Sequence, residues 1–134
     1  MKFDHIGLAV ENIEQYFKTV LEPVFHCTMT SKIFTDELQG SKVAFAETID
    51  GTTLELVEPM GPKSPVAPIL ANKRGGLYHM CFLAGDFEKD IERCKKNKFT
   101  MISSPKPAIA FNNRRVAFFL TPSNEVIEIL EEVK

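Results

Sequence analysis

The chain has few of the residues that mark a disulfide-rich protein or a cysteine-bound zinc site. Its 134 residues include three cysteines, Cys27, Cys81 and Cys94, an odd number without C-x-x-C spacing. A disulfide framework needs paired cysteines and a thiolate zinc site needs closely spaced ones, so neither is indicated. We expect three reduced thiols, with Cys81 and Cys94 in the core.

An excess of one charge and long apolar runs are also missing. Sixteen basic and eighteen acidic residues give a net charge of -2, which argues against nucleic acid as a partner. No apolar run approaches the roughly 20 residues that cross a bilayer. The first residues alternate like a strand and include Asp4, unlike a signal peptide. We therefore expect a cytoplasmic protein with no membrane partner.

The composition is that of a folded domain. Hydrophobic residues make up 44% of the chain, and eleven of them are phenylalanine, which is enough for one globular unit with its own core. Prolines and glycines gather between residues 59 and 76, where a short helical turn is expected near 66–72. We therefore predict a single domain, 1–134, built from two modules, about 1–58 and about 77–134, with the linker between them.

An internal repeat places a histidine and a glutamate at matching positions in each half. His5 precedes Glu55 by 50 positions, and His79 precedes Glu128 by 49. Apolar residues flank both glutamates, so strand alternation turns each carboxylate to the face opposite its neighbours. Two such modules facing each other would bring two imidazoles and two carboxylates around one divalent metal ion.

The patterning of each half reads β-α-β-β-β. In the first half, strands are expected near 3–10, 25–34, 42–49 and 52–58, with a helix that Asn12 caps and Pro23 ends. The second half repeats this with strands near 77–84, 100–103, 115–121 and 125–131 and a helix capped by Asp86. The polar, proline-rich composition of residues 103–115 predicts a loop that borders a site. The predicted fold is α+β, with the sheets curling around a central cleft.

Three segments then carry a family resemblance. Residues 4–10, 54–59 and 126–131 resemble the ligand strands of the vicinal oxygen chelate superfamily, which includes glyoxalases, bleomycin resistance proteins and dioxygenases. Residues 64–70 and 73–80 are similar to the linker and second histidine strand of its methylmalonyl-CoA epimerase branch. The resemblance implies tandem βαβββ modules in a barrel-like mixed sheet, with metal ligands at His5, Glu55, His79 and Glu128.

The activity that the resemblance implies is a metal-dependent isomerase or epimerase. Such an enzyme abstracts a proton next to a carbonyl or thioester that a metal polarises. Glu128 would be both ligand and acid/base, and Glu47 is the nearest carboxylate for a second base. Lys106, Arg114 and Arg115 are candidates for binding an anionic substrate such as an acyl-CoA. The alternative for these three is that they are solvated surface cations.

Other functions remain open at this stage. A glyoxalase-like lyase is one, an iron-dependent dioxygenase is disfavoured by four protein ligands, and a non-catalytic small-molecule binding or resistance protein is another. The ligand set suits cobalt, manganese, nickel, zinc or magnesium. The family that the chain resembles commonly forms homodimers, so the resemblance implies a homodimer. The two modules could complete the site within one chain or between subunits.

Overall fold

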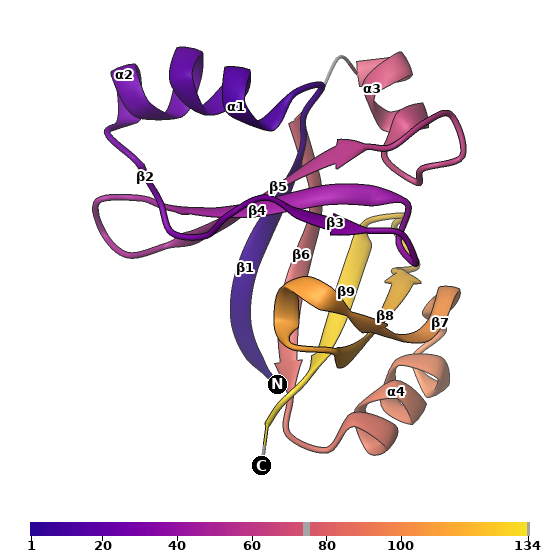
Figure 1. Ribbon diagram of the computed structural model, residues 1–134. Helices are drawn as coiled ribbons and strands as arrows, with labels where there is room; N and C mark the ends of the chain where they lie inside the picture. The colour runs from indigo at the N-terminus through magenta and orange to yellow at the C-terminus, as the bar shows by residue number, and fades with distance from the viewer. Residues whose placement is uncertain (74–75, 134) are drawn as a thin grey trace. The chain divides into compact units, whose positions relative to one another are not determined.

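The computed structural model describes residues 1–73 and 76–133. Its internal contacts divide the chain into two compact units, one of His5–Tyr78 and one of Met1–Asp4 with His79–Lys134. Each unit combines helices with parallel and antiparallel strands (Figure 1). The predicted α+β class and the tandem βαβββ modules are confirmed.

The first module is ordered β2-β4-β5-β1, with β3 also paired to β4. Strand β5 runs parallel to β1 and antiparallel to β4, so the last strand of the module lies beside its first. The Asp50-Gly51 hairpin joins β4 to β5, with Gly51 at a φ of 87°. The strands of this module are β1 (Lys2–Ala9), β2 (Thr28–Met29), β3 (Phe34–Asp36), β4 (Ser41–Glu47) and β5 (Thr53–Pro59).

The region predicted as one strand over 25–34 is different. It holds the end of a helix and then two short strands, β2 and β3, which both pair antiparallel with β4. Residues 30–33 lie between them, and the Ser31 hydroxyl accepts a hydrogen bond from the Phe45 backbone N–H at 2.8 Å. A side chain therefore takes the place of part of the backbone ladder, which alternation alone does not reveal.

The first helix is one coil of three parts, α1 (Ile13–Tyr16), the π-helical η1 (Phe17–Leu21) and α2 (Glu22–Phe25) (Figure 1). Asn12 caps it as predicted, accepting from the Gln15 N–H at 2.9 Å. The prediction that Pro23 ends the helix is wrong. A π turn precedes the proline, which stands in the first turn of α2, where its missing N–H costs little. The helix ends at His26, which takes a left-handed φ of 53°.

The second module repeats the topology in the order β6-β9-β8-β7. Strand β9 is parallel to β6 and antiparallel to β8. Asp86 caps its helix as predicted, accepting from the Lys89 N–H at 3.2 Å. The elements are β6 (Gly76–Ala84), α4 (Phe87–Lys96), β7 (Thr100–Ala108), the 3-10 turn η2 (Ile109–Phe111), β8 (Arg114–Leu120) and β9 (Val126–Glu131).

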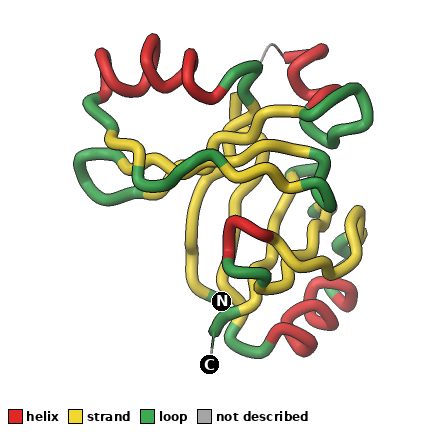
Figure 2. Tube along the Cα trace, viewed as in Figure 1, coloured by secondary structure: helices red, strands yellow, loops and turns green. Residues whose placement is uncertain are grey.

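The segment 103–115 is not the loop that its prolines suggested. Strand β7 continues to Ala108, and only residues 109–113 turn before β8 (Figure 2). Two register shifts interrupt its pairing with β8, on either side of Ser103. Because β7 is the last strand in its order, Pro105 and Pro107 lie on an edge strand, where a missing backbone N–H is tolerated.

Each module buries its own apolar cluster between helix and sheet. All three cysteines are buried and outside any disulfide. Cys27 and Cys94 belong to these clusters, and burial raises the pKa of the Cys94 thiol. The first cluster consists of Val10, Ile13, Leu21, Cys27, Ala44, Ala46 and Leu56. The second consists of Ala84, Phe87, Ile91, Cys94, Ala117, Phe119, Ile127 and Ile129.

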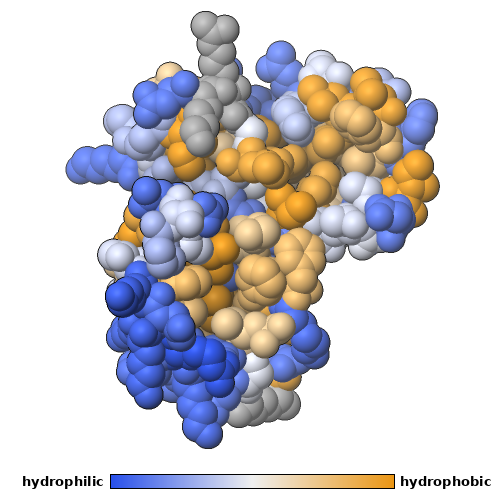
Figure 3. Space-filling model, turned by 180° about the vertical axis from the view of Figure 1, so that it is seen from behind, coloured by the Kyte–Doolittle hydropathy of each residue, from blue (hydrophilic) through white to orange (hydrophobic). Residues whose placement is uncertain are grey.

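The linker contains the predicted short helix, α3 (Ala67–Lys73). A buried hydrogen bond of 2.9 Å between the hydroxyls of Ser41 and Ser64 ties the start of the linker to β4. Arg74 and Gly75, part of the segment that resembles the epimerase branch, lie outside the described residues. Within 1–73 and 76–133, no helix is long and apolar enough to cross a membrane. The hydrophilic surface in Figure 3 includes the charged outer face of α4.

Candidate metal centre

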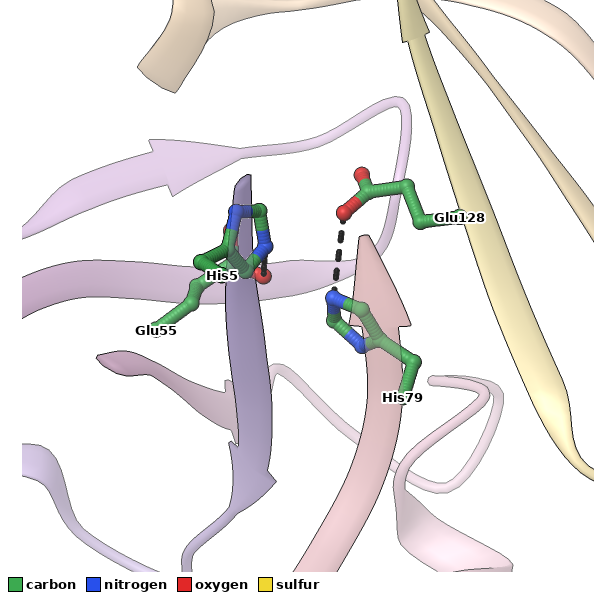
Figure 4. A group of neighbouring side chains, drawn as sticks. All are labelled: His5, Glu55, His79 and Glu128. Carbon is green, nitrogen blue, oxygen red and sulfur yellow. Dashed lines mark ion pairs between the residues drawn. The ribbon is translucent and has the colours of Figure 1, made fainter. Parts of the chain in front are cut away.

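The first module holds one of the two predicted histidine–glutamate pairs. His5 Nε2 lies 3.3 Å from Glu55 Oε1 (Figure 4). Both residues are almost fully buried, at 0% and 4% exposure. The pairing of β1 with β5 places Gly7 opposite Glu55, so His5, two residues before Gly7, points to the same face as the carboxylate.

The second module holds the other pair in the same setting. His79 Nε2 lies 3.0 Å from Glu128 Oε1 (Figure 4). Exposure is again low, at 5% and 3%. The pairing of β6 with β9 puts Cys81 opposite Glu128, which is the place that Gly7 has in the first module. Both predicted pairs thus form, each from the first and last strand of its own module.

Each pair has the spacing of two ligands on one ion. Imidazole nitrogen and carboxylate oxygen bind divalent metals at about 2.1 Å, so two such atoms set about 90° to 105° apart at the metal are about 3.0–3.3 Å from each other. The observed distances are 3.3 Å and 3.0 Å. Nitrogen and carboxylate oxygen also suit first-row divalent ions. The chemistry and the spacing of both pairs therefore fit a divalent metal.

An aromatic residue lies beside each histidine–glutamate pair and was not predicted from the sequence as part of the site. Phe45 is the β4 partner of Glu55, and Phe118 is the β8 partner of Glu128. Directly opposed residues share a sheet face, so both rings lie on the faces of the ligand pairs. The signal was present in the chain: the tripeptide Val-Ala-Phe occurs at 43–45 and at 116–118, each time ten positions before the glutamate.

Glu47 lies on the same face of the first module as the ligands. It is two residues along β4 from Phe45 and opposite Thr53, so alternation turns it toward the side of Glu55. Its side chain is exposed, at the end of the strand. In this it differs from the two candidate ligand carboxylates, Glu55 and Glu128, which are buried.

Arg114 and Arg115 are engaged by the fold itself. Arg115 stacks on Phe87, 4.6 Å from the ring centre, and its guanidinium pairs with Glu131 and with Glu88. This pairing lowers the pKa of the Glu131 carboxyl. Arg114 donates to the backbone carbonyls of Phe111 and Glu131, at 3.1 Å and 3.3 Å. These contacts give both arginines a structural role.

Lys106 differs from the arginines in its place on the sheet. Its partner on β8 is Val116, two residues from Phe118, so Lys106 shares the face of the His79–Glu128 pair. It is half-buried. Arg115, an odd number of residues from Phe118, is on the opposite face, against α4. Of the three predicted cations, Lys106 has the most suitable place for meeting a ligand on that face.

The repeated topology and the two buried histidine–glutamate pairs define a class of protein: a duplicated α+β fold with a candidate site for a divalent metal. Residues 4–118 match the model of the Glyoxalase/Bleomycin resistance protein/Dioxygenase superfamily. The chain belongs to this superfamily, as its sequence predicted. Glu128 lies beyond the matched residues.

Individual relatives fall mainly among epimerases. An ethylmalonyl-CoA/methylmalonyl-CoA epimerase from Cereibacter sphaeroides is 25% identical over 87% of this chain and 86% of its own length. The uncharacterized protein YqjC of Bacillus subtilis is 30% identical, over 87% and 81%. The structure of a Streptomyces coelicolor methylmalonyl-CoA epimerase variant in complex with 2-nitronate-propionyl-CoA has a TM-score of 0.81 at 21% identity, covering 100% of this chain and 99% of that one.

Proposed function

We propose that this protein is a metal-dependent isomerase or epimerase that moves a proton next to the thioester carbonyl of an acyl-CoA. The observation that carries the proposal is the duplicated histidine–glutamate pair, at 3.3 Å and 3.0 Å, buried in each module. Two pairs would supply four protein ligands, and the remaining positions of a six-coordinate divalent ion would be open to water or substrate oxygens. The names of the epimerase relatives supply the substrate class.

His5, Glu55, His79 and Glu128 would together hold one divalent ion, within one chain. Each offers one ligand atom of a suitable kind. A divalent ion draws electron density from a carbonyl oxygen and so acidifies the neighbouring C–H. The superfamily resemblance also favours a homodimer, in which each subunit would carry its own site.

The proton itself would be moved by carboxylates of this chain. Glu128 keeps a second carboxylate oxygen besides the one that faces His79, and that oxygen can act as an acid or base. Glu47, exposed on the ligand face of β4, is the candidate for the partner base. A pair of bases would invert the centre, and a single base would support an isomerisation. Lys106 would meet an anionic group of the substrate.

Exchange of the α-proton in D2O tests this function directly. We expect NMR to show solvent deuterium entering methylmalonyl-CoA with the metal-loaded wild-type protein and not with Glu128→Gln. Glu47→Gln should slow epimerisation much more than Glu14→Gln, an exposed helix residue used as control. If the metal-loaded wild type catalyses no exchange with this thioester or with ethylmalonyl-CoA, the proposed activity is wrong.

A second candidate is a binding protein of the same superfamily. The exposed position of Glu47 is the observation that favours it, since a proton-transfer base is usually sheltered from water. Such a protein would bind acyl-CoA without exchanging its α-proton, so calorimetric binding with no exchange would identify this alternative.

A further inference from the structure

The two candidate ligand histidines each meet a phenylalanine ring edge-on. The ring centres of His5 and Phe45 are 5.9 Å apart, with the planes at 74°. Those of His79 and Phe118 are 5.6 Å apart, with the planes at 90°. Edge-to-face contacts of this kind are a favoured aromatic geometry. The same contact is therefore built twice, once inside each module.

We propose that Phe45 and Phe118 are positioning residues that hold the imidazoles of His5 and His79 in the orientation that binds the metal. The inference rests on the metal site proposed above. Rotation of a histidine ring about its Cβ–Cγ bond is soft. The glutamate contact holds the imidazole at Nε2, and a phenylalanine ring standing edge-on to the imidazole restricts its rotation further. A ligand fixed in advance binds its metal more tightly.

The positions of the two phenylalanines argue for this role rather than for simple core filling. Neither belongs to the apolar cluster of its module. Phe119, the next residue after Phe118, does belong to one and is 0% exposed, because alternation turns it to the helix side of the sheet. Phe118 and Phe45 are only half-buried. The chain thus places a core phenylalanine and a ligand-face phenylalanine side by side on β8.

The sequence around the two phenylalanines is also repeated. Each phenylalanine ends a Val-Ala-Phe tripeptide, and each is the register partner of a ligand glutamate. The glutamate contacts Nε2 of the histidine and the phenylalanine contacts its ring, so three strands of each module act on one imidazole. In the first module these are β1, β4 and β5, and in the second β6, β8 and β9. The same combination of residue types therefore occurs in both modules.

The test compares Phe45→Leu and Phe118→Leu with Phe119→Leu as the matched control. Calorimetry with Co²⁺ should show each ligand-face variant binding between about twofold and tenfold more weakly than wild type. Phe119→Leu should lower the melting temperature the most and keep wild-type affinity. In the metal-free protein, imidazole ¹⁵N and ¹³C resonances should change at His5 in Phe45→Leu and at His79 in Phe118→Leu.

Two results would overturn the role of the phenylalanines. One is Co²⁺ affinity within twofold of wild type in both ligand-face variants, and the other is an equal loss in Phe119→Leu. Failure of the proposed metal site looks different, because the wild type itself would then bind no Co²⁺, whereas failure of the proposed activity alone would leave Co²⁺ binding intact. If the wild type binds no Co²⁺, the imidazole resonances of the metal-free protein still test the proposal. Resonances that keep their wild-type positions in both variants would show that the phenylalanines do not position the two imidazoles.

Discussion

At the scale of single residues, the two modules differ at the positions beside their candidate ligand glutamates. Gly7 stands opposite Glu55, while the buried Cys81 stands opposite Glu128. Two of the candidate substrate-binding cations, Arg115 and Lys106, also differ in their surroundings. Arg115 is held by two carboxylates and an aromatic ring, whereas Lys106 lies on the ligand face. Side chains that look equivalent in the sequence therefore have different surroundings in the structure.

Lys106 gives the first residue-scale prediction. If Lys106 binds an anionic group of the substrate as proposed, its replacement by alanine removes a charge-assisted hydrogen bond, and KM for the proposed acyl-CoA should rise roughly tenfold with little change in kcat. Steady-state kinetics beside Lys89→Ala, an exposed α4 residue, would measure it. A KM for Lys106→Ala equal to that of the control would assign Lys106 to the solvated surface.

Glu131 gives a prediction about pH. Arg115 lowers the pKa of this carboxyl below its ordinary value of 4.5, so the ion pair stabilises the fold above that value and is lost as the pH falls through the lowered pKa. Glu131→Gln should cost about 0.5 kcal/mol at pH 7, a small value because water screens a partly exposed pair. Urea unfolding should show this difference at pH 7 and a smaller one at pH 3. An equal difference at both pH values would contradict the assignment.

At the scale of elements, the two capped helices begin where the sequence predicted, and the first ends later than predicted. Side-chain caps are local, so Asn12 and Asp86 could be recognised from their spacing alone. Glu58 could not, although it accepts a hydrogen bond of 2.9 Å from the Ile13 N–H, because that contact joins residues 45 positions apart. The predictions based on Pro23 and on the prolines of β7 were wrong for a related reason. The fold tolerates Pro23 after a π turn and tolerates the β7 prolines on an edge strand, and neither setting can be recognised from local sequence.

The caps support a matched prediction for the two modules. Asn12→Ala and Asp86→Ala each remove the side-chain oxygen that accepts from a helix N–H, and each should lower the free energy of unfolding by about 1 kcal/mol. Chemical denaturation would measure both. Asn12→Ala should cost less than Asp86→Ala, because Glu58 still satisfies one N–H of the first helix. The reverse order would show that Glu58 does not share the capping.

At the scale of the whole molecule, the repeat found in the sequence is also the organisation of the structure. Two modules of the same strand order carry the same triad of histidine, glutamate and phenylalanine. The histidines and glutamates were predicted because their spacing repeats and their residue types bind metals. The phenylalanines were not, because an aromatic in a strand is usually core, and only the register and the ring contacts distinguish Phe118 from Phe119.

A mixing experiment tests how the modules are used. His5→Ala and His79→Ala each lose one ligand of the proposed site, from different modules. If one chain supplies all four ligands, mixtures of the two variants after unfolding and refolding together should bind no more metal than either variant alone. Recovery toward a quarter or half of the wild-type metal content would show instead that subunits share the site.

Metal stoichiometry measures the central claim most directly. Elemental mass spectrometry would be made on untagged wild type, His5→Ala and Glu128→Ala after dialysis against a mixture of divalent metals, with His26→Ala, an exposed residue at the end of α2, as control. We expect close to one ion per chain in the wild type and the control, and little in the two ligand variants. A wild type without metal, or ligand variants that keep the full ion, would contradict a site built from both histidine–glutamate pairs.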